Sequence, residues 1–465
     1  MMYAEFHQDC NHHYEEPVEI SILPVDTSTA GGKEEQMEEE LSQTCKAMEM
    51  VYRCSADSIH SSFNRIGKDL LPLLIHIIQQ DLDNRNLPLT SSSSRPPPTN
   101  DNDDDDGSIT TASSVHATEQ RQESSNHRNN NDTHNNKKHI HKQLLAKKDL
   151  CLKSCTKIMG HFARVGALTE PLAYHPKVLS TLKRLVSCHH HRKTFAAVPI
   201  EARLNALWTI ANLACNVENM VMMACHQGLI DTLLQVSKHS PQEDPQKQQQ
   251  EEVNGNNTNN IQEYMELLRS RSIAVRAILN LSWAPENKIP FAEHTDLVHT
   301  LLRTVIHRTS SWGGRGKGVS AILLQSRRHA AGALRNLAAA PRRTKRFLCC
   351  RSKNSFDLLN KLAEIAQNDP DQAVKDRIHA TFHNLVCADT AEIYTANKAV
   401  MNVLQEAASK GTARINYQAQ DSHNMALRTL RTLEKAIPED LDAYKTLRPI
   451  LDSVEDSLKH CESRN

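Results

Sequence analysis

The sequence predicts an all-α protein built as a right-handed superhelical solenoid of repeats, and three observations lead to this fold class. A short pattern ending in Asn-Leu recurs along the chain, the same two segments follow most copies, and polar inserts fall at one place in the unit. The composition agrees, because aromatic residues make up only 4% and the 465 residues include 14 Gly and 18 Pro. Such a chain is typical of helices packed through aliphatic side chains.

The recurring pattern places its apolar residues on one face of a helix. In most copies a small residue is followed four positions later by an aliphatic residue, and three positions beyond that by Leu. The copies span 206–213, 274–281, 330–337 and 378–385, with a degenerate copy at 426–433, an earlier one at 155–162 and a faint one near 47–54.

Two further segments follow most copies and complete a three-helix unit. The first is a short polar-to-apolar stretch, such as 218–225, and the second is an aliphatic helix, such as 229–236. Equivalents of the aliphatic helix lie at 178–185, 297–305, 356–362 and 400–404. A unit of three helices, with a period near 40 once the inserts are removed, predicts six repeats, or seven if 41–90 forms one.

Composition divides the chain into four parts. We expect residues 1–40 to be an acidic, disordered tail, 41–90 an outlying helical repeat, 91–141 a disordered low-complexity linker and 142–460 the solenoid. Polar inserts interrupt the solenoid at 188–199, 239–260 and 309–319. These segments contain too few apolar residues to offset the entropy lost on ordering.

The repeats resemble those of the armadillo family, which includes beta-catenin and importin alpha. Residues 206–237 (ALWTIANLACNVENMVMMACHQGLIDTLLQVS) resemble one armadillo repeat nearly end to end, and the resemblance covers roughly 150–460. The copies at 274–306, 330–366 and 378–409 keep the Asn-Leu pair and the helices that follow it. HEAT repeats are the nearest alternative, but they usually have two helices and lack the regular Asn.

The resemblance implies a binding groove lined by the third helix of each repeat, where Asn side chains hydrogen-bond the main chain of an extended peptide. An amide offers both a donor and an acceptor, which suits pairing with a peptide unit. The alternative is that each Asn ties its own helix to a neighbouring loop. The candidate groove residues are Trp208, Asn212, Arg276, Asn280, Arg335, Asn336 and Asn384.

A nuclear import adaptor similar to importin alpha is the second interpretation. Trp208 lies four residues before Asn212, as in the lysine-binding slots of that protein. The equivalent positions in the next three copies are Arg276, Gly332 and Ala380, so this chain has a single Trp-Asn pair. The N-terminal tail is also acidic, whereas importin alpha carries a basic arm.

The charge distribution favours an acidic or phosphorylated partner. The net charge is +0, but residues 1–141 carry 11 basic against 24 acidic residues, leaving 44 basic and 31 acidic residues beyond them. Residues 297–356 contain no Asp or Glu, and a stretch of one sign attracts anions. Nucleic acid is a third interpretation, although no interleaved aromatics accompany this stretch. Asp103–Asp106 or Glu34–Glu40 could occupy the basic surface as an autoinhibitory segment.

The sequence does not favour catalysis, a cofactor or a metal. Cys151 and Cys155 could join Cys188 and His189–His191 at a zinc site, but Cys155 occupies the small-residue position of its repeat, where it packs as alanine does. The glycine-rich run 313–318 lacks the strand that a phosphate loop needs. With no signal peptide and no span of about 18 apolar residues, we expect a reduced cytoplasmic or nuclear protein without membrane insertion.

Overall fold

A computed structural model covers residues 1–465 and describes 71–83, 123–187, 198–238, 257–307, 317–350, 357–409 and 417–462. All of these residues belong to one compact unit, Thr44–Asn465. The described residues are helical and contain no β-strand, which confirms the predicted all-α class.

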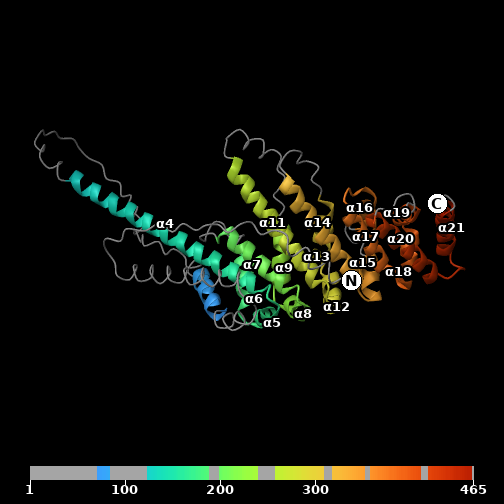
Figure 1. The fold of residues 1–465 in the computed structure, drawn as a ribbon, viewed down its shortest axis with the longest axis horizontal. Helices are drawn as coiled ribbons and strands as arrows, with labels where there is room; N and C mark the ends of the chain where they lie inside the picture. Colours follow the sequence, from blue (N-terminus) through green and yellow to red (C-terminus); the bar gives the residue numbers. More distant parts are fainter. Residues whose placement is uncertain are drawn as a thin grey trace, which may run out of the picture. The chain divides into compact units, whose positions relative to one another are not determined.

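The helices form three layers, each containing one helix from successive repeats (Figure 1). The first layer is α5 (Gly166–Tyr174), α8 (Val217–Cys225), α12 (Pro285–Glu293), α15 (Arg342–Cys350) and α18 (Ala388–Ala396). The second layer is α6 (Val178–Ser187), α9 (Leu229–Lys238), α13 (Thr295–Ile306), α16 (Leu358–Asn368) and α19 (Lys398–Ser409).

The third layer contains the recurring sequence pattern and is the most continuous of the three. It consists of α4 (Glu123–Phe162), α7 (Ile200–Leu213), α11 (Asn257–Leu281), α14 (Lys317–Ala338), α17 (Gln372–Leu385) and α20 (Tyr417–Ala436). Each helix packs against the next in chain order, and α21 (Asp442–Glu462) covers α18, α19 and α20 at the end of the stack. This order of three helices per unit is the one predicted for an armadillo-like solenoid.

The apolar positions of the pattern form the core, as the periodicity predicts. In α7 the side chains of Ala206, Ile210 and Leu213 are completely buried. The corresponding residues of the other third-layer helices are all buried as well: Cys155, Met159, Phe162, Ala274, Ile278, Leu281, Ala330, Leu334, Leu337, Ile378, Phe382, Leu385, Ala426, Leu430 and Leu433. Burial of apolar surface contributes about 25 cal/mol per Å² to stability. These side chains therefore stabilise the contacts between neighbouring repeats along the whole stack.

Two glycines lie where a side chain would be strained or crowded. Gly228, between α8 and α9, has a φ of 71°, in the left-handed region that favours glycine. Gly332 in α14 lies against α11, and a Cβ there would be 3.0 Å from Leu279 Cδ1. The third-layer helices thus approach one another closely at a position where α7 carries Trp208.

Three helix starts differ from the predicted boundaries. Helix α4 begins at Glu123, so 123–141 is helical where we expected a disordered linker, and α11 and α14 begin inside the predicted inserts 239–260 and 309–319. The physical reason is propagation: no Pro interrupts 123–162, and extending an existing helix costs far less than starting one. The insert residues 188–197, 239–256 and 308–316, the acidic tail and most of the linker lie outside the described residues.

The predicted outlying repeat is represented by a helix at 71–83. Its Leu74, Ile75, Ile78 and Leu82 are buried, and Gln79 Nε2 donates to Thr181 Oγ1 of α6 at 3.1 Å. Because this helix packs on a second-layer helix, residues before the linker contribute to the solenoid. The faint copy at 47–54 lies outside the described residues.

Candidate interaction surface

The repeated Asn residues connect successive third-layer helices. Asn280 Nδ2 donates to the carbonyl of Ala211 at 3.0 Å, Asn336 Nδ2 to that of Leu279 at 3.3 Å, and Asn384 Nδ2 to that of Arg335 at 3.0 Å. In each case the acceptor belongs to the residue that precedes the Asn of the previous repeat. The register is the same in all three, so the amides form a ladder between repeats.

This ladder changes what the Asn residues can offer a partner. Asn280 is 1% exposed and Asn336 is 5% exposed, so neither presents an amide to solvent. Asn212 and Asn384 are half-buried. Asn280, Asn336 and Asn384 thus connect neighbouring elements of the fold, which is the structural role that the sequence left open as the alternative to peptide binding. Main-chain contact with a peptide stays a prediction, and Asn212 and Asn384 are the two of these four residues that are partly exposed to solvent.

Trp208 and Arg276 are brought together, although 68 residues separate them in the sequence. The guanidinium carbon of Arg276 lies 5.1 Å from the centre of the Trp208 ring, within the range of a cation–π contact. Trp208 is 38% exposed, whereas Arg276 is 8% exposed. The stacked pair thus presents an aromatic surface supported by a buried positive charge. Arg335, the other predicted charge contact, is half-buried on α14.

A buried histidine lies close to this pair. Burial and the charges of Arg276, Arg377 and Arg328 together lower the pKa of His329 to about 3, against a raising contribution from a hydrogen bond with the Ser272 backbone. His329 is therefore neutral at physiological pH.

The first layer contains a second set of Asn ties that the sequence analysis missed. Asn219 Nδ2 donates to the carbonyls of Leu213 and Thr169, and Asn287 Nδ2 to those of Leu281 and Met220. Each amide caps its own third-layer helix and reaches the first-layer helix of the previous repeat. The sequence contained a signal for these ties, because both Asn residues lie seven positions after an Asn of the recurring pattern.

A third ladder, also missed, consists of basic side chains nine residues before the pattern position of Asn. Its members are Arg203, Arg271, Arg327, Lys375 and His423. Arg327 Nε donates to the Val305 carbonyl at 2.9 Å and Lys375 Nζ to that of Gln367 at 3.2 Å, while His423 Nδ1 lies 3.3 Å from that of Ala407. These acceptors are in the last turns of α13, α16 and α19, where carbonyls lack helical partners and carry partial negative charge.

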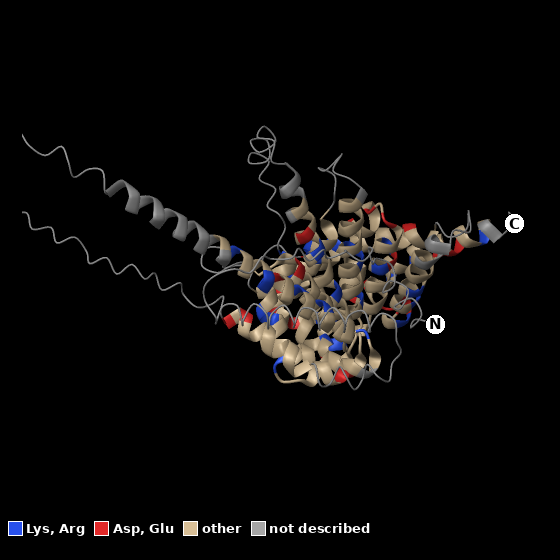
Figure 2. Cartoon of the chain, turned by 60° about the vertical axis from the view of Figure 1, so that its left-hand side comes forward, with Lys and Arg blue, Asp and Glu red and all other residues tan. Residues whose placement is uncertain are grey.

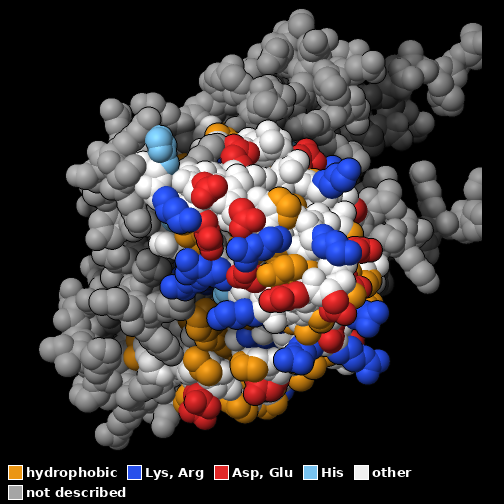
Figure 3. All heavy atoms as spheres, turned by 90° about the vertical axis from the view of Figure 1, so that its right-hand side faces the viewer, with side chains coloured by type: hydrophobic (Ala, Val, Ile, Leu, Met, Phe, Trp, Pro, Cys, Tyr) orange, Lys and Arg blue, Asp and Glu red, His pale blue; other side chains and the backbone are white. Residues whose placement is uncertain are grey.

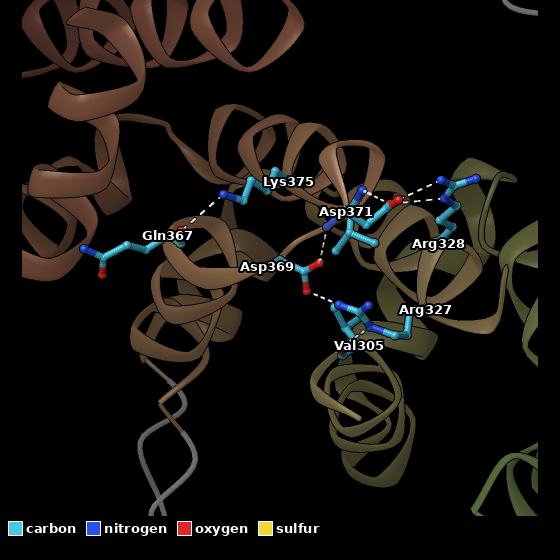
Figure 4. A network of polar contacts seen from close by, with 8 residues as sticks. Val305, Arg327, Arg328, Gln367, Asp369, Asp371 and Lys375 are labelled. Atoms are coloured by element: carbon cyan, nitrogen blue, oxygen red, sulfur yellow. Dashed lines mark hydrogen bonds and ion pairs between the residues drawn. The ribbon is translucent and has the colours of Figure 1, made fainter. Parts of the chain in front are cut away.

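Arg327 is the most completely paired member of this basic ladder. It is 6% exposed and forms an ion pair with the buried Asp369, the residue that ends α16 (Figure 4). The neighbouring Arg328 forms two hydrogen bonds with Asp371, at 3.1 and 2.7 Å. Burial raises the pKa of Asp371, but hydrogen bonds from Arg328 and the Val374 backbone, with the charges of Arg328 and Arg327, outweigh it and hold the pKa below its usual value.

These pairs qualify the predicted basic surface at 297–356. Arg327 and Arg328 belong to the stretch without acidic residues, yet Asp369 and Asp371 from beyond it neutralise them. Figure 2 shows Lys and Arg together with Asp and Glu along the helices of the stack. Among the described residues of the stretch, the exposed arginines are Arg303, Arg342, Arg343 and Arg346. At the end where α21 lies, Figure 3 shows acidic and basic side chains interspersed.

The cysteines considered for zinc are part of the core. Cys151 and Cys155 are 2% and 0% exposed, and 188–191 lie outside the described residues. Within the described ranges, no group of three or more His, Cys, Asp or Glu residues is arranged to hold a metal ion. In the same ranges, no helix combines the length and apolar character of a membrane span.

Layer order, burial and register together define an all-α solenoid of armadillo-like three-helix repeats. The solved structures similar to this chain include a designed armadillo repeat protein, YIII(Dq)4CqI, with 17% identity over 60% of this chain and 93% of that chain and a TM-score of 0.39. A computationally designed armadillo repeat protein for modular peptide recognition has 17% identity over 60% and 93% of the two chains and a TM-score of 0.40.

A third similar structure is designed armadillo repeat protein YIII(Dq.V1)4CPAF in complex with the peptide (KR)4. It has 16% identity over 60% of this chain and 92% of that chain, with a TM-score of 0.39. No protein-family model and no curated protein matches the sequence. The assignment of the fold therefore rests on the helix order and packing described above.

Proposed function

We propose that this chain is a non-catalytic scaffold that binds a peptide segment of a partner protein on its third helix layer. The observation that carries the proposal is the Trp208–Arg276 pair next to Asn212. An indole that is 38% exposed lies over a buried guanidinium, and an amide follows one helical turn later. Aromatic and Arg side chains are enriched among residues that dominate protein interfaces, because they combine apolar area with polar contacts.

The arrangement suits an extended segment better than a small molecule. The third-layer helices repeat at a regular register, as the three Asn ties show, so equivalent positions recur along the face. Trp208 and Asn212 lie on α7, and Asn384 lies on α17, two helices beyond the neighbouring α11. A partner that contacts both ends of this series must be a chain that runs across several repeats.

For the partner's chemistry we propose an acidic or phosphorylated segment. The exposed Arg303, Arg342, Arg343 and Arg346 support this choice, since they lie within a 60-residue stretch that has no acidic residue of its own. Charges of one sign attract partners of the opposite sign over a distance and raise their association rate. Arg303 lies on α13 of the second layer and the other three arginines lie on α15 of the first. A basic import signal or a nucleic acid remains an outcome of the test.

The test is a peptide array probed with the full-length protein, with acidic, phosphorylated and basic peptides and a single-stranded RNA. We compare the unmodified chain with Trp208→Ala plus Asn212→Ala. Trp283→Ala is the matched control, because Trp283 is 37% exposed but lies in the turn after α11.

The proposal predicts binding of acidic or phosphorylated peptides that the double variant loses by tenfold or more and the control retains. Binding that is unchanged in the double variant would place the functional surface on another face. Selective binding of basic peptides would instead favour an import adaptor, and RNA binding with a steep salt dependence would favour the nucleic-acid interpretation.

A further inference from the structure

A small basic cavity lies where α9, α11 and α13 meet, and none of the described residues that line it is acidic. Its volume is about 80 Å³, and its lining includes Lys238, Arg271, Thr300, Arg303, Thr304 and His307. A single water needs roughly 10–15 Å³ of such space, so the cavity has room for a group of several heavy atoms. The lining combines positive charge with hydroxyl groups, which is the chemistry that binds an oxyanion.

Arg271 is the buried charge of this cavity. Its side chain is buried, with the residue 4% exposed, and its Nη2 donates to Thr304 Oγ1 at 3.3 Å. Its Nε and Nη1 are buried and have no hydrogen-bond partner among the described residues. Burial, together with the charge of Arg303, lowers the pKa of Arg271 to about 10, so the guanidinium remains charged at neutral pH. A buried cation without an anion is costly, and buried charges in proteins are normally paired.

The repeat register shows which group is missing. Arg271 and Arg327 occupy the same position, nine residues before Asn280 and Asn336. Arg327 lies between the end of α13, through Val305, and the end of α16, where its partner Asp369 follows the last helical residue. Arg271 lies between the ends of α9 and α13 in the same way, but the residue that follows α13 is His307. The carboxylate that completes the Arg327 site is thus replaced by an imidazole.

We propose that this cavity binds a phosphate monoester, carried by a phosphorylated serine or threonine of a partner polypeptide. The phosphate oxygens accept hydrogen bonds from Arg271 and from the neighbouring Arg303 and Thr300, and so occupy the place that Asp369 fills one repeat later. A phosphomonoester carries a charge of about −1.5 to −2 near neutral pH and three terminal oxygens. It therefore suits two arginines and several hydroxyls better than a single carboxylate does. Lys238 already pairs with Asp296 at 2.6 Å and plays a smaller part.

Phosphate binding by the cavity is independent of the Trp208 surface. The polypeptide carrier rests on the proposed scaffold function, and the experiment separates the two. The full-length protein is titrated by calorimetry with inorganic phosphate, with a short Ala-Gly peptide carrying one phosphoserine, and with the same peptide carrying Ser or Glu. Chloride at equal ionic strength is the reference.

Two variants remove the site by different routes. Arg271→Gln removes the buried charge, and His307→Asp supplies the carboxylate found at the equivalent position of the next repeat. Both are expected to weaken phosphate binding by tenfold or more, and His307→Asp should also raise the melting temperature. Arg448→Gln, which changes an exposed arginine of α21 outside the basic stretch, is the control and should bind phosphate as the unmodified chain does.

Tighter binding of the phosphoserine peptide than of inorganic phosphate, lost in both variants, supports the proposal. Absence of phosphate binding, or binding that His307→Asp leaves unchanged, overturns the site. Binding of inorganic phosphate without tighter binding of the phosphoserine peptide overturns the polypeptide carrier. None of these results depends on Trp208→Ala, so a failure of this site and a failure of the scaffold face are distinguishable.

Discussion

Arg271 and Arg327 occupy one position of the repeat and have different surroundings. Arg327 is surrounded by the Val305 carbonyl and the Asp369 carboxylate, and the result is a closed, buried contact between repeats. Arg271 has Thr304 as its hydrogen-bond partner and His307 where the carboxylate would be, and the result is a cavity. The comparison teaches that a repeat fold can turn a structural contact into a candidate binding site by changing one residue at the end of a helix.

The largest loss of unfolding free energy is expected from removing the carboxylate of the Arg327–Asp369 ion pair. Asp369→Ala leaves Arg327 buried without its anion, and breaking a buried pair in this way typically costs about 3–5 kcal/mol. Urea denaturation should show this loss of unfolding free energy. Asp452→Asn removes a partner of Arg448 from an ion pair whose side chains are both about half exposed, and should destabilise the protein far less. Equal effects would mean that burial does not distinguish the two pairs.

The next largest effect is the dependence of stability on pH, which two buried histidines contribute. Burial lowers the pKa of His329 to about 3 and that of His379 to about 4. Below pH 6.5 these histidines bind protons in the unfolded chain but stay neutral in the folded chain. The free energy of unfolding should therefore fall as the pH falls from 6.5 towards about 4. Each group contributes at most about 1.4 kcal/mol per pH unit.

Thermal melts between pH 7.5 and 4.5 measure this dependence. His329→Gln should reduce the slope of stability against pH. An unaltered slope in this variant would show that His329 becomes protonated within the fold.

A smaller loss of unfolding free energy is expected from the Asn ladder, and it should be larger at a buried amide than at a half-buried one. Asn336→Ala removes a donor to the Leu279 carbonyl in a buried setting, which should cost about 1–3 kcal/mol. Asn384→Ala removes the equivalent bond from a half-buried residue and should cost less. Urea denaturation of the two variants gives the ranking, and a larger cost at Asn384 would contradict it.

The smallest expected effect is on the stacked pair. Trp208→Leu keeps apolar area but removes the ring that stacks against Arg276, a contact worth roughly 0.5–1 kcal/mol at a partly exposed site. The melting temperature should fall slightly, while peptide binding should fall far more if the proposed face is correct. A large loss of stability with unchanged binding would assign Trp208 to structure alone.

The sequence predicted the repeat and its core because both depend on local periodicity. The spacing of Ala206, Ile210 and Leu213 is enough to orient a helix, and the same spacing recurs in every copy. Helix starts were less predictable. Nothing in the polar composition before residue 141 shows that α4 continues back to Glu123.

The candidate site depended on contacts between repeats, which periodicity does not contain. The bond from Asn280 to Ala211 joins residues 69 positions apart, so the sequence could not decide whether the amide faces a partner or a neighbouring helix. The basic stretch also looked uncompensated until Asp369 and Asp371 were placed beside it. The basic ladder could have been found, since its members keep a constant distance of nine residues from the pattern position.

The central claim is that the residue after the second-layer helix decides whether the buried arginine beside it needs an external anion. The most direct measurement is calorimetric titration of the double variant His307→Asp plus Asp369→His with inorganic phosphate, together with the same titration after adding Arg271→Gln or Arg327→Gln. The account predicts that the swapped protein still binds phosphate, that Arg327→Gln now abolishes binding, and that Arg271→Gln no longer does. Binding that still depends on Arg271 in the swapped protein would contradict it.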